Sequence, residues 1–199
     1  MPISIVGAGG HAKAIIAAAE ASSQRVVSLY DDRFPCEAVC GVAVVGTIAD
    51  GFSTNGHLII GLGNNKLRAI LAADRQQGPW GNAQHLHSVL HSSVQVGVGT
   101  VILAGAVLQP DTIIGTHCII NTGATVDHDC QLGDYVHVGP GAVLAGGVKV
   151  ESGAMIGAGA VVCPGLTIGA WARIGAGGVV VKDCLEGATY VGVPAKRVE

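Results

Sequence analysis

Aliphatic residues recur at every sixth position from Leu90 to Val180 without a gap. A helix needs apolar residues about every 3.6 positions, whereas short strands joined by tight glycine-containing corners can repeat with a period of six. The pattern therefore predicts a β-solenoid in which each hexad supplies one short strand and one corner. Its inward positions are Leu90, Val96, Ile102, Leu108, Ile114, Ile120, Val126, Leu132, Val138, Leu144, Val150, Ile156, Val162, Ile168, Ile174 and Val180.

Three hexads fill one coil of a three-sided solenoid, so residues 18 apart in the sequence should stack in columns. Neighbouring coils lie roughly 4.8 Å apart, the spacing between strands in a sheet. This register places His128 directly beneath Gly146, and it places Pro140, Ala158 and Ala176 in another column. A histidine beneath a glycine puts an imidazole beside a backbone edge that a ligand can approach closely.

The first 87 residues follow a different pattern, which predicts an α/β domain before a solenoid domain of residues 88–199. Short apolar runs predict strands over 3–6, 25–30 and 57–61, and helical runs cover 11–21 and 66–77. Residues 83–86 read as a last strand that leads into the solenoid. Strands alternating with helices are typical of an α/β sandwich with a mostly parallel sheet.

A glycine turn follows the first strand, and its sequence G-A-G-G-H-A satisfies the G-x-G-x-x-A form of the dinucleotide fingerprint. Taken literally, the motif indicates NAD, but roughly 85 residues hold only half of a classical dinucleotide fold. We therefore expect a nucleotide-linked molecule whose phosphates approach the N–H groups at the start of the first helix. Acidic residues after the second strand would then lie near the ribose or base. In the simpler alternative, the glycines merely turn the chain.

Composition is consistent with a thin prism of Val, Ile, Ala and Gly, since the chain has 31 glycines, 4% aromatic and 13% charged residues. The net charge of −3 argues against nucleic acid as a partner.

The N-terminal run lacks the features of a signal peptide and no segment is long enough to span a membrane, so we expect a cytoplasmic protein. Cys118 and Cys130 fall on inward positions, whereas Cys36 and Cys40 would be only half of a metal site.

Polar residues cluster in one stretch of the solenoid, from Asn121 to His137, where the surrounding sequence is Gly, Ala and aliphatic. Corners face water and accept polar residues freely, which is the simpler explanation for some of them. For His128 we favour a catalytic role, because Asp129 beside it can orient the ring, fix its tautomer and raise its basicity. Cysteine–histidine catalysis is not favoured, because Cys130 points inward and His128 lies on a corner.

Several segments together resemble the NeuD/PglD family of sugar O- and N-acyltransferases. They are the hexapeptide repeats, I-V-G-A-G-G-H-A-K, S-L-Y-D-D, G-L-G-N-N, V-D-H-D-C with Y-V-H-V-G-P-G-A behind it, and the ending Y-V-G-V-P-A-K-R-V. The resemblance implies a Rossmann-like nucleotide-binding half domain followed by a left-handed parallel β-helix. It also implies a homotrimer with active sites between neighbouring prisms. Among the branches, the chain is most similar to enzymes that acetylate the 4-amino group of UDP-4-amino-4,6-dideoxy sugars with acetyl-CoA.

The resemblance also implies a role for individual residues. His128 would be the general base, and Asp129 its acidic partner at a position where the family often has Glu. The acetyl-CoA site would comprise His137, Gly146, Ala158, Ala176 and Lys196. The UDP-sugar site would comprise Gly9, Gly10, His11, Asp31, Asp32, Gly63 and Asn121, and no metal is implied.

Four other functions remain open from the sequence. Two are close relatives of the first: N-acetylation of a GDP-4-amino sugar such as GDP-perosamine, and O-acetylation of a sialic acid. A third is a zinc-dependent γ-type carbonic anhydrase, although His128 and His137 lie nine residues apart rather than at the H-x-x-x-x-H spacing of that family. The fourth is a non-catalytic solenoid that senses a nucleotide sugar.

Overall fold

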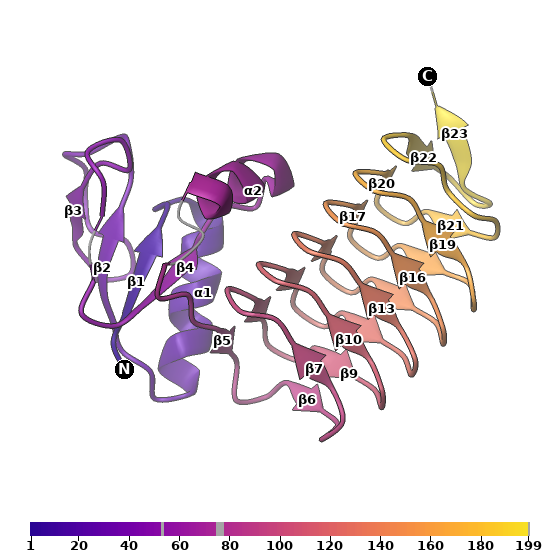
Figure 1. The fold of residues 1–199 in the computed structure, drawn as a ribbon, viewed down its shortest axis with the longest axis horizontal. Helices are drawn as coiled ribbons and strands as arrows, with labels where there is room; N and C mark the ends of the chain where they lie inside the picture. The colour runs from indigo at the N-terminus through magenta and orange to yellow at the C-terminus, as the bar shows by residue number, and fades with distance from the viewer. Residues whose placement is uncertain (53, 75–77, 199) are drawn as a thin grey trace.

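The computed structural model describes residues 1–52, 54–74 and 78–198. It consists of an N-terminal α/β domain and a three-sided parallel β-solenoid, which continues to the C-terminus (Figure 1). Within the described ranges, no helix is long and apolar enough to cross a membrane.

The α/β domain contains one parallel sheet with the strand order β3-β2-β1-β4. Its strands are β1 (Ile3–Val6), β2 (Val26–Tyr30), β3 (Val44–Gly46) and β4 (His57–Ile60), and its helices are α1 (Gly10–Ala21) and α2 (Asn65–Asp74). β1 is buried along its whole length, as expected for a central strand of a parallel sheet. The expected strands and helices are present, and β3 is an addition. The predicted end of the second helix, at residue 77, lies outside the described residues.

The solenoid confirms the period of six. From β5 to β18, each strand pairs in parallel with the strand 18 residues later, for example Ile119 with His137 and His137 with Met155. The inward aliphatic and small residues form one continuous core along the prism, which includes Ile120, Val138 and Ile156. The coil register used to predict the residue columns is therefore correct.

The three faces of the solenoid are named here by one strand each. The β14 sheet contains β5 (Ala83–Gln84), β8 (Val101–Ile102), β11 (Ile119–Ile120), β14 (His137–Val138), β17 (Met155–Ile156), β20 (Arg173–Ile174), β22 (Thr189–Val191) and the antiparallel β23 (Lys196–Val198). The β12 sheet contains β6 (Val89–Leu90), β9 (Val107–Leu108), β12 (Thr125–Val126), β15 (Val143–Leu144), β18 (Val161–Val162) and β21 (Val179–Val180). The β13 sheet contains β7 (Gln95–Val96), β10 (Ile113–Ile114), β13 (Gln131–Leu132), β16 (Lys149–Val150) and β19 (Thr167–Ile168).

One residue in each corner adopts the left-handed backbone conformation. Positive φ values occur at every sixth residue from Gly99 to Gly177, and most of these positions are glycine, which adopts this conformation without steric cost. Five corners carry another residue there: Asp111, His117, Asp129, Tyr135 and Trp171. Bulky side chains are uncommon in this region of backbone space, so these corners are candidates for function.

The two domains share a hydrophobic core. Ala83, Val101 and Leu103 of the first coils belong to the same buried cluster as Ile3 and Ile15 of the α/β domain. β5 pairs with β8, so the β14 sheet already begins at Ala83. The α/β domain is thus packed directly on one end of the solenoid.

Candidate active site

His128 and Asp129 occupy the corner between β12 and β13. The His128 Nδ1 atom lies 2.8 Å from Asp129 Oδ2, and both side chains are more than half exposed. Asp129 is the left-handed corner residue, with φ of 59°, and its N–H donates to the Pro110 carbonyl one coil below. The fixed backbone of the corner therefore holds the carboxylate beside the imidazole.

This pair defines the tautomer of His128. A carboxylate can only accept a hydrogen bond, so Nδ1 carries the proton and Nε2 keeps its lone pair. The Asp129 hydrogen bond, followed by the charge of Asp127, raises the pKa of His128 above its ordinary value. The result is a solvent-accessible imidazole of increased basicity.

Gly146 lies against the ring of His128, as the register predicted. A Cβ at Gly146 would be 2.6 Å from both Cε1 and Nε2 of His128, so only glycine leaves room for the ring in this position. The neighbouring Gly147 N–H donates to the His128 carbonyl at 2.9 Å. The Gly146 N–H itself donates no hydrogen bond to any described residue. It is therefore free to bind a ligand oxygen beside the imidazole.

A second cluster lies where α1 meets the β14 sheet. His137 projects from β14 and is only 8% exposed, and the His11 ring of α1 lies 6.4 Å away between centroids. Asn121 Nδ2 donates to His137 Nε2 at 3.0 Å, which leaves the proton of a neutral His137 on Nδ1. That atom faces the Gly63 backbone without a hydrogen bond of normal geometry. Four of the predicted ligand-binding residues are thus brought together here.

Both histidines of this cluster are neutral at pH 7. Burial, together with the positive charge of Arg68, lowers the pKa of His11 and of His137 to about 4, and His137 adds to the effect on His11. The buried His11 Nε2 has no hydrogen-bond partner among the described residues. The cluster consequently offers two uncharged rings with unused hydrogen-bonding atoms.

The glycine turn of the α/β domain opens onto a pocket of about 540 Å³. Gly9 and Gly10 line it, and a Cβ at either residue would meet nothing within 4 Å. Gly9 caps α1 without a side-chain hydrogen bond, and the first turn of α1 has no acidic residue. Lys13 and Arg33 line the same pocket, so free N–H groups and two cations converge where phosphates were expected.

Asp31 and Asp32 are engaged with the protein itself. Asp31 accepts from the Ala8 N–H and from the Arg33 guanidinium, which lowers the pKa of Asp31 to about 2. Asp32 accepts from the N–H groups of Ile48 and Ala49. Arg33 was not among the residues chosen from the sequence, nor was Lys13, although Lys13 directly follows the G-A-G-G-H-A motif.

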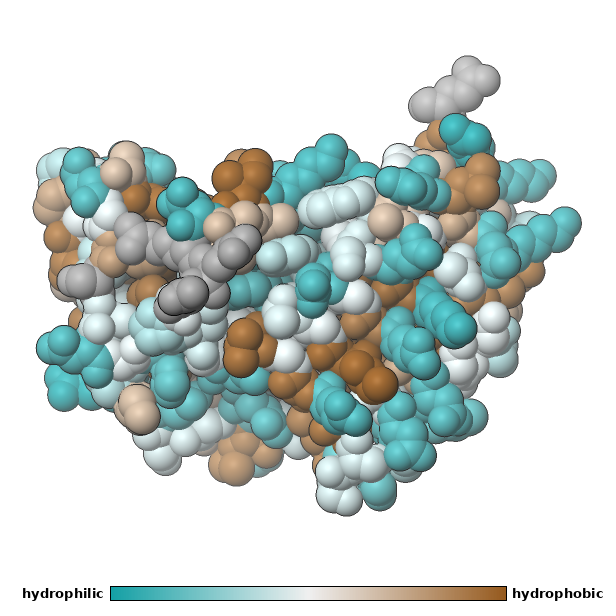
Figure 2. All heavy atoms as spheres, viewed as in Figure 1, coloured by the Kyte–Doolittle hydropathy of each residue, from teal (hydrophilic) through white to brown (hydrophobic). Residues whose placement is uncertain are grey.

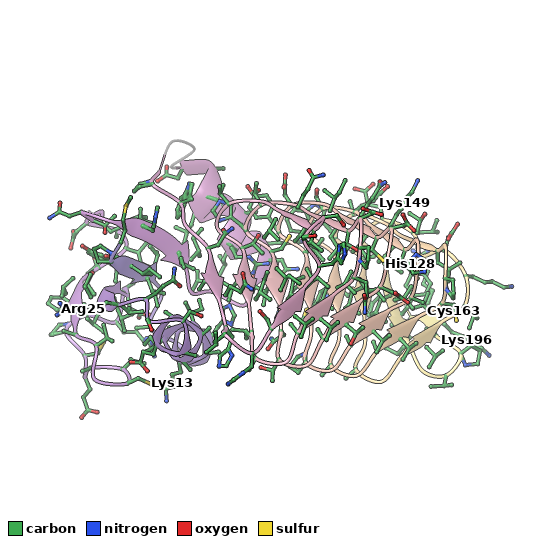
Figure 3. All side chains as sticks on the ribbon, turned by 90° about the horizontal axis from the view of Figure 1, so that it is seen from below. Lys13, Arg25, His128, Lys149, Cys163 and Lys196 are labelled. Carbon is green, nitrogen blue, oxygen red and sulfur yellow. The ribbon has the colours of Figure 1, made fainter. Side chains whose placement is uncertain are left out.

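Ala158, Ala176 and Lys196 lie elsewhere on the solenoid. Pro140, Ala158 and Ala176 form the predicted column, linked by hydrogen bonds from Gly159 N–H to Pro140 and from Gly177 N–H to Ala158. This column runs along the edge between the β14 and β12 sheets, whereas His128 and Gly146 lie on the edge between the β12 and β13 sheets. Figure 3 shows Lys196 beyond His128 toward the C-terminal end, and Lys13 far from both on the α/β domain. Within one chain, the proposed base and the alanine column are therefore separate.

No three His, Cys, Asp or Glu side chains are grouped as metal ligands in the part of the chain that the structure describes. Cys36 and Cys40 are exposed and line the glycine-turn pocket, and the buried Cys118 and Cys130 are free thiols.

Comparison with known proteins matches both domains. Residues 2–74 match the PglD N-terminal domain, and residues 111–146 match the bacterial transferase hexapeptide (six repeats). A search of curated proteins returned no match.

Solved structures match the whole chain. A GDP-perosamine N-acetyl transferase variant from Caulobacter crescentus, in complex with CoA and GDP-perosamine, is 41% identical over 100% of this chain and 97% of that one, with a TM-score of 0.93. The acetyltransferase domain of PglB from Neisseria gonorrhoeae, in complex with acetyl coenzyme A, is 33% identical over 99% and 98%, with a TM-score of 0.93. WeeI from Acinetobacter baumannii is 27% identical over 100% of both chains, with a TM-score of 0.89.

Proposed function

This chain belongs to the NeuD/PglD family of sugar acetyltransferases, and we propose on that premise that His128 is the general base with which it acetylates the amino group of a nucleotide-linked amino sugar. The protein is an acetyl-CoA-dependent sugar acetyltransferase, and acetyl-CoA is its cosubstrate. The observation that carries the proposal for His128 is its free Nε2 atom beside the unused N–H of Gly146.

The arrangement at this corner supports direct transfer. The amine nitrogen attacks the thioester carbonyl and forms the C–N bond, while His128 Nε2 accepts a proton from the nitrogen. The Gly146 N–H is placed to donate to the oxyanion that develops. When the C–S bond breaks, the protonated His128 returns its proton to the departing thiolate of coenzyme A. Asp129 stabilises the imidazolium during the step.

The glycine-turn pocket supports the nucleotide half of the site. A diphosphate fits this pocket because it is lined by two cations, Lys13 and Arg33, and by the free N–H groups of α1. The second cluster lies on the side of α1 that faces the solenoid and consists of the neutral His11 and His137 with Asn121 and Gly63. A sugar extending from that diphosphate toward the solenoid would contact this cluster. We therefore assign His137, which the family resemblance places in the acetyl-CoA site, to the sugar site instead. Asp31 contributes by holding Arg33 at the pocket.

The β12 sheet supports assembly as a homotrimer. Its outward positions form a largely apolar stripe of five valines and one threonine: Val89, Val107, Thr125, Val143, Val161 and Val179. The β13 sheet, which faces the viewer in Figures 1 and 2, instead presents a mixture of apolar and charged side chains. Threefold packing of the β12 sheets would bring the His128 edge of one subunit beside the alanine column of the next. The separation of these two groups within one chain then has a simple explanation.

The nucleotide base has two candidates. The sequence resemblance implies UDP, whereas a 41% identical relative was solved in complex with GDP-perosamine. The relative solved with GDP-perosamine matches this chain along its whole length. We therefore propose a GDP-linked amino sugar as the first substrate to test and its UDP-linked counterpart as the second.

Mass spectrometry of reactions with acetyl-CoA and GDP-, UDP- or CMP-linked amino sugars tests the proposal. We expect one acetyl group per sugar, resistant to hydroxylamine because an amide, unlike an ester, survives it. His128→Gln should lower kcat by about 10²–10⁴-fold, the usual effect of losing a general base. His91→Gln, which changes an exposed histidine at the solenoid entrance, is the matched control and should leave kcat unchanged. Acetylation of no nucleotide amino sugar would refute the substrate class, and an active His128→Gln would refute the base.

A further inference from the structure

A buried arginine joins the two domains. Arg68 of α2 is 1% exposed, and its guanidinium donates four hydrogen bonds. Nε donates to the His117 carbonyl at 2.7 Å, and one terminal nitrogen donates to the Leu62 carbonyl at 2.9 Å. The other terminal nitrogen donates to the Tyr135 carbonyl at 2.8 Å and to Asn65 Oδ1 at 3.0 Å. The acceptors thus come from α2, from the turn before it and from two coils of the solenoid.

No carboxylate of the described residues forms an ion pair with Arg68. The ion pairs in the described ranges are Arg33–Asp31 and His128–Asp129, so Arg68 is held only by carbonyl and amide dipoles. Burial lowers the pKa of Arg68 to about 10, and the side chain stays protonated at pH 7. An apolar side chain in this position would leave four buried acceptors without a donor, which is unfavourable. Arg68 therefore holds the two domains together in one arrangement.

Three of the four bonds go to backbone carbonyls, and two of these carbonyls lie close in sequence to residues of the proposed sugar site. Leu62 immediately precedes Gly63, and Tyr135 lies two residues before His137. Asn65 extends the attachment, since its Nδ2 atom donates to the carbonyls of Gly153 and Ala154 in the next coil. Figure 1 shows α2 lying between the sheet of the α/β domain and the solenoid. The Gly63 turn and the coil that carries His137 are thus tied to the same guanidinium.

The charge of Arg68 also acts on the histidines of this cluster. It is one of the causes that lower the pKa of His11, His117 and His137, alongside their burial. The other ionisable groups that bear on these positions are Cys118 and Tyr135 beside Arg68, and Asp134 beside His117. Burial, assisted by this fixed cation, therefore keeps the rings of His11 and His137 uncharged.

We propose that Arg68 is a positioning residue for acetyl transfer. It holds the Gly63 turn, and with it the bound nucleotide sugar, at a fixed distance from His137 and Asn121. The inference rests on the proposed function for the identity of the substrate. The physical basis of the proposal is that the rate of the reaction depends steeply on the position of the reacting groups, since misplacement by about 1 Å can lower the rate about 10²-fold.

Steady-state kinetics of Arg68→Met and Arg68→Lys in the full-length enzyme test the proposal. We expect Arg68→Met to lower kcat by roughly 10²-fold. The KM for acetyl-CoA should not change, and neither should the Kd for free GDP or UDP, because both bind away from Arg68. Arg68→Lys keeps the charge but reaches fewer carbonyls, so it should also lose kcat. Lys66→Met, an exposed change on the same helix, is the control. Wild-type kcat in folded Arg68→Met would overturn the proposal.

A readout without turnover separates this inference from the proposed function. In the wild type, NMR titration of labelled His11 and His137 should show pKa values of about 4. In Arg68→Met both values should rise because a nearby positive charge is lost, and amide exchange over residues 62–66 should accelerate. If Arg68→Met does not fold, Arg68→Lys should still show the faster exchange. Unchanged exchange in the folded variants would overturn the positioning role whatever the substrate is.

Discussion

Asp129 combines a left-handed backbone with a carboxylate bonded to His128, so Asn is the informative replacement at this position. Asn tolerates the same backbone conformation and removes only the charge. The neutral His128 is the active form, and Asp129 raises its pKa, so Asp129→Asn should lower that pKa. In a plot of kcat against pH, we expect the acid limb to move to lower pH. The plateau value of kcat should also fall, because the base is weaker. Measurement of kcat from about pH 5 to pH 9 checks this; an unmoved acid limb would contradict the pairing.

Gly146 gives a second prediction at the same corner. In Gly146→Ala the new methyl group would lie 2.6 Å from Nε2, so the exposed ring must swing away from Asp129. We expect kcat to fall by at least about 10-fold while the thermal midpoint changes little. The double variant Gly146→Ala/His128→Gln should be no slower than His128→Gln alone, because both changes remove one function. Additive losses would show that Gly146 acts independently of the ring.

At the level of the repeating coil, the corner glycines fall into two classes. Gly159 has φ of 64°, and nothing lies within 4 Å of an added Cβ, whereas a Cβ at Gly157 would be 2.6 Å from the Ile174 carbonyl oxygen and the Ala176 nitrogen. Gly159→Ala should therefore lower the free energy of unfolding only by the penalty for a left-handed alanine, about 1–2 kcal/mol. Gly157→Ala must push neighbouring backbones apart and should lower the thermal midpoint more. Equal shifts in thermal unfolding would refute this distinction.

Local elements were predictable where the sequence repeats. The inward aliphatic residues and the contact of His128 with Gly146 follow from periods of six and 18. By contrast, β3 is three residues long and pairs with the edge of β2. Its only local signal is the short valine-rich run of residues 42–45 between two glycines, where no strand was predicted. Arg68 could not be foreseen, because helical periodicity does not tell which face of α2 packs on the solenoid. Likewise, the bonds of Asp31 to Ala8 and Arg33 depend on how two loops meet.

At the scale of the whole molecule, the valine stripe on the β12 sheet leads to a prediction about assembly. Val143→Asp would place a charge in the centre of the proposed subunit interface, where burying an unpaired carboxylate is strongly unfavourable. We expect light scattering to show a monomer in place of a trimer, with loss of acetyl transfer. Gln131→Asp, the matched control at an exposed polar position of the β13 sheet, should remain trimeric and active. A trimeric Val143→Asp would place the interface on another face.

If each active site combines two subunits, inactive variants of different edges should complement one another. His128→Gln removes the proposed base, and Ala158→Glu blocks the column on the opposite edge of the β12 sheet. In a mixed trimer, a site is complete when one subunit supplies an intact His128 and its neighbour an intact Ala158. Random mixing of equal amounts should then restore about a quarter of the wild-type sites. Coexpression with distinct tags, followed by purification through both tags, removes the inactive homotrimers; each remaining mixed trimer then has one complete site, so about a third of the wild-type activity is expected. If His128 and Ala158 served the same site from one chain, every subunit would carry one defect and the mixture would stay inactive.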